Sequence, residues 1–237
     1  MQAVILAGGR GFRLDPYTRV LPKPLFPVGN QPLAGILVRQ LKVAGYSEIV
    51  MCLGYLADII QAYFQDGSRF GIPIRYVTET TPLGTAGPLK NIAGLAEDFL
   101  VINGDELTTL DFRSLYGYHL AEQAAMTVAV QAKNLAASFG VLGIQNGRVT
   151  EYREKPALNY WASMGIYMLS RRATELIPAG KQFDMPDLVQ VLLAEQAYVA
   201  GYVSRDLWFD IGTMDDLEKA KRVVEENPVF AEFRSQN

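Results

Sequence analysis

Apolar and polar positions follow two alternating periods along the first half of the chain. Four short aliphatic runs predict buried strands, at 3–7, 48–54, 72–79 and 99–104. Three segments between them repeat apolar residues at helical spacing, at 33–45, 57–65 and 85–96. This order of strands and helices predicts a mostly parallel sheet that is covered by helices on both faces.

The second half is less regular. Helices are expected at 110–123, 185–196 and 213–227, and strands at 125–132, 160–170 and around 199–212. Between them, residues 139–154 predict a hairpin that turns at Asn146-Gly147, because both turn positions favour a positive φ. We expect this antiparallel element to lie over the sheet, within one domain that spans residues 1–237.

Composition narrows the classes of protein. The net charge of −3 argues against a nucleic-acid or polybasic membrane partner. One cysteine, Cys52, and one histidine, His119, exclude a disulfide framework and make nucleophilic catalysis by either residue improbable. We expect Cys52 to be a buried strand residue and His119 to lie at a surface or rim. The opening apolar run is too short for a signal peptide or a membrane span, so we expect a cytoplasmic protein.

The loop after the first strand combines glycines with cations. These residues are Gly8, Gly9, Gly11, Arg10, Arg13, Arg19 and Lys23. Glycines let backbone N–H groups approach a ligand closely, and the cations suit a polyphosphate. A Walker loop is excluded because Pro24 follows Lys23, and the glycine spacing does not match a dinucleotide fingerprint.

This stretch closely resembles the opening signature of the sugar-1-phosphate nucleotidylyltransferases, with the mannose-1-phosphate guanylyltransferases the most similar group. Further motifs of that family follow in order at 82–87, 103–105, 154–156, 165–167 and 208–213, so the resemblance covers essentially the whole chain. One departure is Phe12, which stands where the family usually has threonine. The resemblance implies a three-layer α/β/α Rossmann-like fold with a mostly parallel mixed sheet and a small antiparallel element. Many relatives carry a C-terminal left-handed β-helix; since the chain ends soon after the last predicted helix, we expect that module to be absent.

The resemblance implies that a sugar 1-phosphate attacks the α-phosphorus of a nucleoside triphosphate, giving a nucleotide-sugar and pyrophosphate. Asp105 and Asp210 each follow an apolar run and would reach the phosphate rim if both strands ran parallel to the first. From sequence alone they could equally close a turn and cap a helix. The resemblance makes them the ligands of Mg²⁺, Arg13 the residue that holds pyrophosphate, and Lys23 the residue that neutralises charge at the α-phosphate.

The remaining site residues follow from the same resemblance. Nucleotide contacts are expected from Leu6, Ala7, Gly8, Gly9, Gly11, Arg13, Lys23, Glu79, Gly84 and Asp105. Sugar-phosphate contacts are expected from Asn103, Gly140, Glu154, Lys155 and Ser163. Among these, Lys155 would draw in the sugar phosphate and act with Arg13, Lys23, Asp105 and Asp210 in catalysis.

Glu79 stands where the family reads the base. A carboxylate only accepts hydrogen bonds, and guanine presents two adjacent donors, so Glu79 favours GTP unless it simply points to solvent. Mannose 1-phosphate is the first choice of sugar. UTP or dTTP with glucose 1-phosphate, or GTP with a heptose 1-phosphate, remains open. So does a non-catalytic subunit that binds nucleotide-sugar, although all five charged residues are present. A homo-oligomer is possible.

Overall fold

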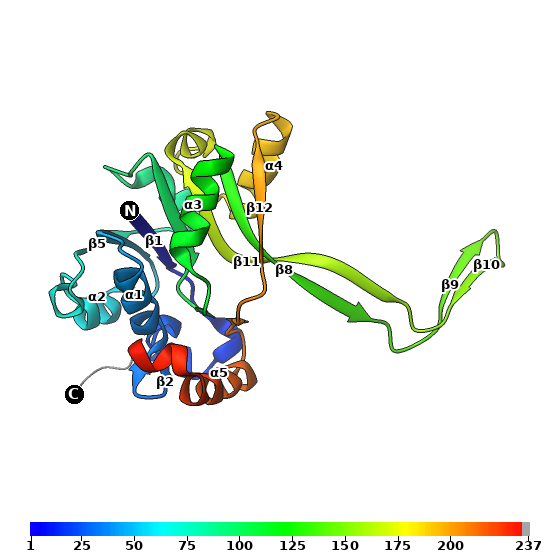
Figure 1. Cartoon of the computed structure of the whole chain (residues 1–237), viewed down its shortest axis with the longest axis horizontal. Coiled ribbons are helices and arrows are strands. Elements are labelled where there is room, and N and C mark those ends of the chain that lie inside the picture. The colour runs from blue at the N-terminus through cyan, green and yellow to red at the C-terminus, as the bar shows by residue number, and fades with distance from the viewer. Residues whose placement is uncertain (234–237) are drawn as a thin grey trace.

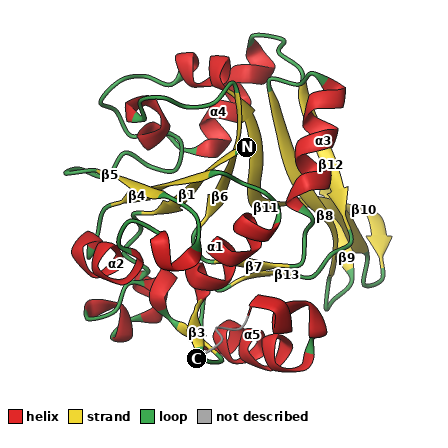
Figure 2. Ribbon diagram, turned by 60° about the vertical axis from the view of Figure 1, so that its left-hand side comes forward, coloured by secondary structure: helices red, strands yellow, loops and turns green. Residues whose placement is uncertain are grey.

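The computed structural model describes residues 1–233, which are built around a seven-stranded sheet (Figures 1 and 2). Its strand order is β12-β8-β11-β6-β1-β4-β5. These strands are β1 (Gln2–Ala7), β4 (Glu48–Leu53), β5 (Ile74–Thr78), β6 (Asp98–Asn103), β8 (Met126–Ala136), β11 (Ala157–Ser170) and β12 (Val199–Ser204). β6, β1, β4 and β5 run parallel, β11 pairs antiparallel with β6 and β8, and β12 runs parallel to β8. The mostly parallel mixed sheet expected from the sequence is therefore confirmed.

Helices cover both faces of this sheet. α1 (Leu33–Val43), α2 (Ala57–Phe64) and α3 (Phe112–Glu122) pack on one face, in the same apolar cluster as Ile5 and Ile102. α4 (Met185–Ala194) packs on the opposite face with Val4 and Val101. Neighbouring residues of one strand thus face different layers, because side chains alternate across a sheet.

A third apolar cluster joins the two ends of the chain. α5 (Met214–Glu226) begins at Thr213 and Asp216, whose side chains and backbone groups form the predicted capping box. Its Leu217 and Val224 pack with Leu14 and Phe26 from the loop after β1. The C-terminal helix therefore supports the loop that the sequence singles out as a phosphate site.

Shorter elements connect these layers. The short strands are β2 (Pro27–Val28), β3 (Gln31–Pro32), β7 (Glu106–Thr108) and β13 (Trp208–Asp210). The 3₁₀ turns are Phe12–Leu14, Tyr17–Arg19, Lys23–Leu25, Ser68–Phe70, Gly87–Asn91, Arg171–Leu176 and Pro228–Phe233. The helix expected at 85–96 is wrong in extent: only the 3₁₀ turn Gly87–Asn91 forms, since Ile92 is already extended and Gly94 has a φ of 70°.

The predicted hairpin is present, but its expected position over the sheet is wrong. β9 (Val141–Gln145) and β10 (Arg148–Arg153) pair around Asn146 and Gly147, whose φ angles of 49° and 77° fit a two-residue hairpin turn. β8 and β11 carry this hairpin away from the body of the molecule as a two-stranded ribbon (Figure 1). We call residues 133–162 the arm.

No helix in residues 1–233 combines the length and the apolar composition that a membrane crossing requires.

Candidate active site

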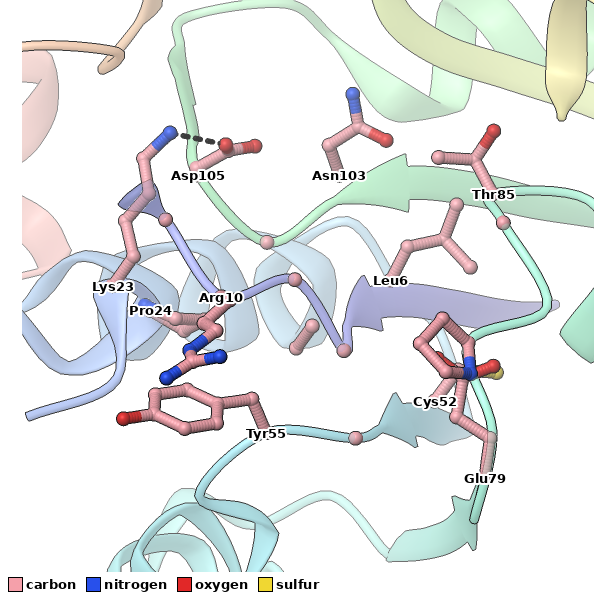
Figure 3. Close-up of a pocket in the computed structure, with 18 of the residues that line it drawn as sticks. Leu6, Arg10, Lys23, Pro24, Cys52, Tyr55, Glu79, Thr85, Asn103 and Asp105 are labelled. Carbon is pink, nitrogen blue, oxygen red and sulfur yellow. Dashed lines mark hydrogen bonds and ion pairs between the residues drawn. The ribbon is translucent and has the colours of Figure 1, made fainter. Parts of the chain in front are cut away.

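A pocket of about 950 Å³ opens where β1, β4, β5 and β6 end (Figure 3). Its walls come from the segments that follow these strands: 6–14, 52–55, 79–88 and 103–105, together with Lys23, Pro24 and Gly212. Ligands of open α/β sheets bind at this carboxyl edge. Eleven of the residues predicted from the sequence line this pocket: Leu6, Ala7, Gly8, Gly9, Gly11, Arg13, Lys23, Glu79, Gly84, Asn103 and Asp105.

The glycine loop has space for a ligand on its pocket side. Gly11 adopts a left-handed conformation with φ 64°, and its carbonyl accepts a hydrogen bond from Thr18 Oγ1 at 3.2 Å. A Cβ at Gly8 would lie 2.9 Å from Glu79 Oε1, whereas a Cβ at Gly9 would meet nothing within 4 Å. The loop therefore packs closely at Gly8 and stays open at Gly9, where a phosphate group could approach the backbone.

Lys23 connects the loop with two carboxylates. Its side chain is buried, and its Nζ donates to Asp105 Oδ2 (Figure 3). Asp210 Oδ1 lies 3.9 Å from the same Nζ. Pro22 and Pro24 flank it at the start of a 3₁₀ turn and restrict the backbone there. The residues predicted to neutralise charge and to hold metal are thus brought together.

The three arginines of the loop differ in their environment. Arg13 is exposed to the pocket, and its Nη1 lies 2.7 Å from the position of a Cβ on Gly212. Arg10 lies over the rings of Phe12 and Tyr55, at 5.1 Å from each centroid. Both line the pocket, whereas Arg19 forms an exposed ion pair with Asp15 at 2.6 Å. Arg19 is therefore outside the site, contrary to the expectation of one cluster of four cations.

Three carboxylates meet beside Lys23. Asp105, Glu106 and Asp210 each place an oxygen within 4.8 Å of the others. Asp105 follows β6, which is parallel to β1, as expected. Asp210 does not follow a strand of the seven-stranded sheet. It ends β13, which pairs antiparallel with β7 in a separate two-stranded sheet, and it lies opposite Glu106. Carboxylate oxygens at this spacing suit a hard divalent cation, which takes oxygen ligands.

Glu106 was missed by the sequence reasoning. Its side chain is 4% exposed and accepts hydrogen bonds from Trp208 Nε1 at 2.7 Å and Asn103 Nδ2 at 3.3 Å. Burial, with a smaller contribution from the charge of Asp105, raises the pKa of Glu106 to about 9. The only sequence signal was its place directly after Asp105.

Glu79 lies on the opposite side of the pocket. Its Oε2 accepts a hydrogen bond from the Leu83 backbone N–H at 3.0 Å, and Oε1 faces Gly8 and Gly54. Burial raises the pKa of this carboxyl above its usual value. Glu79 therefore points into the pocket rather than to solvent, which removes one of the two interpretations of this residue.

The loop that contains Gly84 is anchored from the far face of the sheet. Gly84 has φ 79°, and a Cβ there would lie 2.6 Å from Asp184 Oδ1. The same oxygen accepts hydrogen bonds from Thr85 N and Thr85 Oγ1, at 2.8 Å and 3.2 Å. Since Asp184 also begins α4, this helix positions the wall of the pocket next to Glu79.

Four predicted sugar-phosphate residues lie outside the pocket. Gly140, Glu154 and Lys155 belong to the arm, and Tyr152 donates a hydrogen bond to Glu154 Oε2. Ser163 lies at the base of the arm, where its Oγ donates to Tyr167 Oη at 3.1 Å. None of these four residues therefore lines the pocket of its own chain.

The two residues excluded as nucleophiles are both buried. Cys52 is a strand residue as expected, and burial raises the pKa of its thiol to about 12. His119 is only 1% exposed, so the expectation of a surface or rim position is wrong. Its ring bonds to Thr127 Oγ1 and Asp98 Oδ1 between α3 and the sheet, remote from the pocket.

Comparison with known proteins identifies the family. A family model described as nucleotidyl transferase matches residues 2–227. The chain belongs to the nucleotidyl transferase family. The family resemblance of the sequence is thereby confirmed.

Relatives within the nucleotidyl transferase family differ in their named substrates. UTP–glucose-1-phosphate uridylyltransferase of Synechocystis sp. is 32% identical over 94% of this chain and 63% of its own length. Mannose-1-phosphate guanylyltransferase of Mycobacterium tuberculosis is 33% identical, over 91% of this chain and 62% of its own. The chain thus spans less than two thirds of these two relatives. D-glycero-alpha-D-manno-heptose 1-phosphate guanylyltransferase of Aneurinibacillus thermoaerophilus is 30% identical, over 95% of this chain and 99% of its own length.

Solved structures confirm the Rossmann-like fold. A Bacillus anthracis chain described as a glucose-1-phosphate thymidylyltransferase, in complex with a sucrose, superposes with a TM-score of 0.76 at 26% identity. The match covers 98% of this chain and 99% of that one. HddC from Yersinia pseudotuberculosis, complexed with GMP-PN, gives a TM-score of 0.74 at 27% identity, over 93% of this chain and 98% of its own.

Proposed function

We propose that this protein transfers a nucleoside monophosphate from a nucleoside triphosphate to a sugar 1-phosphate and releases pyrophosphate. The observation that carries the proposal is the position of Lys23, between Asp105 and Asp210 at the side of a glycine-lined pocket. A cation and a carboxylate cluster together suit a triphosphate with its divalent ion. Membership of the nucleotidyl transferase family supports the same chemistry.

In this proposal the loop after β1 binds the triphosphate. The backbone N–H groups near Gly9 face the phosphates, and Arg13 binds the β- and γ-phosphates that leave as pyrophosphate. Lys23 offsets the charge that develops around the α-phosphorus. Asp105 and Asp210, with Glu106 beside them, would hold Mg²⁺, which supplies further neutralisation of phosphate charge when bound.

The attacking group needs no base from the protein. A phosphate monoester has a second pKa of about 6, so its oxygen is already an anion at neutral pH. The protein contributes positioning and charge neutralisation, which dominate phosphoryl-type transfer. The one thiol among the described pocket residues, Cys52, is buried with a raised pKa, and these residues include no imidazole, which is consistent with this scheme.

GTP is the preferred nucleotide in this proposal. Leu83 N–H occupies one lone pair of Glu79 Oε2, which leaves acceptor positions on both oxygens for the two adjacent donors of guanine. Mannose 1-phosphate is the proposed sugar, with a heptose 1-phosphate the second candidate because a relative matched over almost its whole length is named for that substrate. UTP or dTTP with glucose 1-phosphate is the alternative pair, since relatives of similar identity carry those names.

A screen of pyrophosphate release tests the proposal. The purified protein is incubated with each nucleoside triphosphate, a panel of hexose and heptose 1-phosphates, and Mg²⁺. We expect release with GTP and mannose 1-phosphate, and none when either substrate or the metal is omitted. Nucleotide binding without release in every combination would instead indicate a non-catalytic, nucleotide-sugar-binding subunit.

Glu79→Gln tests the choice of base. The amide replaces one acceptor with a donor, so we expect the ratio of kcat/KM for GTP to that for UTP to fall by about tenfold or more. Glu97→Gln is the matched control because Glu97 pairs with Arg171 outside the pocket. An unchanged ratio in the Glu79 variant would show that this carboxylate does not read the base.

A further inference from the structure

The arm exposes many apolar side chains. Phe139 is 80% exposed and Trp161 is 60% exposed. Leu135, Ile144, Val149, Tyr152 and Leu158 on the same ribbon are also exposed. A lone two-stranded ribbon is at best marginally stable in water, and a large exposed apolar surface marks a contact site. The arm therefore needs a cover that residues 1–233 of its own chain do not provide.

Both edges of the arm are open. β12 pairs with β8 only as far as Gln131, and β6 pairs with β11 only from Ile166. Between these limits the two strands of the ribbon pair only with each other. Their outward N–H and C=O groups can pair with another chain.

The direction of the arm is fixed by packing against the pocket wall. The register of β11 shifts between Ser163 and Tyr167, where Gly165 has φ 69°. A Cβ on Gly165 would collide with the side chains of Asn103 and Glu106, and Met164 is fully buried. The base of the arm is thus held in the core, and the ribbon extends away from the body of the molecule (Figure 1). None of residues 133–162 lines the pocket of the same chain.

Among the described residues, the β6 side of the pocket has no unpaired cation. Arg10, Arg13 and Lys23 come from the loop after β1, and Lys23 already pairs with Asp105 and lies near Asp210 on the β6 side. A second anionic substrate bound there would have no free cation to contact. Lys133, at the base of the arm, already donates to Gln131 Oε1 and lies over the ring of Trp208.

Lys155 lies in the arm between β10 and β11, and its charge is available to a ligand. It is exposed, adopts an uncommon positive φ of 41°, and forms no ion pair within residues 1–233. In a second copy of this chain, the β6 side of the pocket is where such a cation would be complementary to the carboxylates and to a bound anion. In size, the arm matches the roughly 20–30 residues that each partner contributes to a stable interface.

We propose that two copies of the chain exchange arms, so that each arm crosses the pocket of the other copy and Lys155 binds the phosphate of the sugar substrate there. A reciprocal exchange is a closed two-fold arrangement and covers both ribbons at once. The role of Lys155 rests on the proposed function, whereas the exchange of arms does not.

Photo-crosslinking tests the exchange without any activity. Lys155→p-benzoylphenylalanine is prepared in unlabelled protein and mixed with ¹⁵N-labelled protein that carries the same substitution. After irradiation, mass spectrometry identifies which copies and which peptides are joined. We expect crosslinks between labelled and unlabelled copies that land on residues 8–13, 79–88 or 103–106. Crosslinks confined to one copy would show that the arm closes over its own pocket, and would overturn the exchange. So would a monomer in sedimentation at micromolar concentration.

Complementation tests the role of Lys155. Lys155→Ala and Lys23→Ala are each expected to be nearly inactive, but exchanged arms give every mixed dimer one intact site. Random mixing of the two variants should therefore recover about a quarter of wild-type turnover. Lys23→Ala mixed with Asp105→Asn is the matched control, because both residues belong to the same pocket and no site is restored.

The outcomes separate this inference from the proposed function. An active wild type whose Lys155 and Lys23 variants fail to complement would overturn the contribution of Lys155 across copies. A wild type that is inactive with every substrate pair, yet forms crosslinks between copies, would refute the proposed function and leave the exchange of arms standing.

Discussion

At the scale of single residues, charge in the pocket is balanced around Lys23. Its buried ammonium group reaches Asp105 and Asp210, which the chain places 82 and 187 positions away. Without this cation, the carboxylates and a bound α-phosphate would repel one another. Preorganised charges of this kind contribute most where water is excluded.

Lys23→Ala is expected to lower kcat by about 10²–10³-fold, because an electrostatic contact to the reacting phosphate is lost. Circular dichroism should remain unchanged, since the residue lies at the wall of the pocket. Arg19→Ala is the matched control: it removes a cation of the same loop, but one that pairs with exposed Asp15. Equal turnover in the two variants would remove Lys23 from the reaction.

The sequence predicted the pocket residues of the loop after β1, but it did not predict the role of Glu106. Glycines and cations from Gly8 to Lys23 predict a phosphate site, because all of these residues lie within one short stretch of the sequence. Glu106 could not be found in this way: it becomes part of the cluster because Trp208, 102 positions away, buries and hydrogen-bonds it. Contacts between distant segments leave no pattern in one sequence.

At the scale of elements, long periodic segments such as α1 and α5 were predicted closely, whereas residues 85–96 were not. Apolar spacing there is helical, but the extended backbone at Ile92 and the positive φ of Gly94 limit the segment to a 3₁₀ turn. The antiparallel pairing of β13 was also missed, because a three-residue strand carries too little periodicity to show its partner.

His119 fixes α3 against the sheet and should make stability depend on pH. Burial lowers the pKa of His119 below its usual value, although Asp98 at Nε2 acts in the opposite direction. The unfolded chain therefore binds a proton more readily below about pH 6.5, and the free energy of unfolding should fall as the pH drops from 7.5 to 5.5.

His119→Gln tests this dependence. Urea unfolding at several pH values should show a smaller loss of stability on acidification in the variant than in the wild type. At pH 7.5 the variant should itself be destabilised by about 1–3 kcal/mol, since the buried hydrogen bonds to Thr127 and Asp98 are altered. Parallel pH profiles for both proteins would assign the acid sensitivity to other groups.

At the scale of the whole molecule, two segments far apart in the sequence meet at the pocket. Arg13 packs against Gly212, just before α5, and α5 packs on the loop after β1. The sequence indicated both motifs but not their contact. It also gave no means of predicting the direction of the arm, which depends on the packing of Gly165 against Asn103 and Glu106.

Gly212→Ala should displace Arg13 without unfolding the protein. The new methyl group would lie 2.7 Å from Arg13 Nη1, and a flexible side chain can move away at low cost. We expect pyrophosphate inhibition and kcat/KM to weaken by about tenfold, because a charge-assisted contact contributes roughly 1.5–3 kcal/mol. Gly201→Ala is the control, since a Cβ there meets nothing within 4 Å. Identical kinetics in both variants would separate Arg13 from pyrophosphate binding.

Asp184 connects the pocket wall with the start of α4. Its carboxylate accepts a hydrogen bond from Thr85 N in the pocket wall, and its backbone N–H donates to Asp187 in the first turn of α4. A nucleotide that steadies the wall therefore also steadies the start of a helix on the opposite face of the sheet from α1. Amide exchange at residues 185–188 should slow when nucleotide is added, which makes α4 a remote reporter of occupancy.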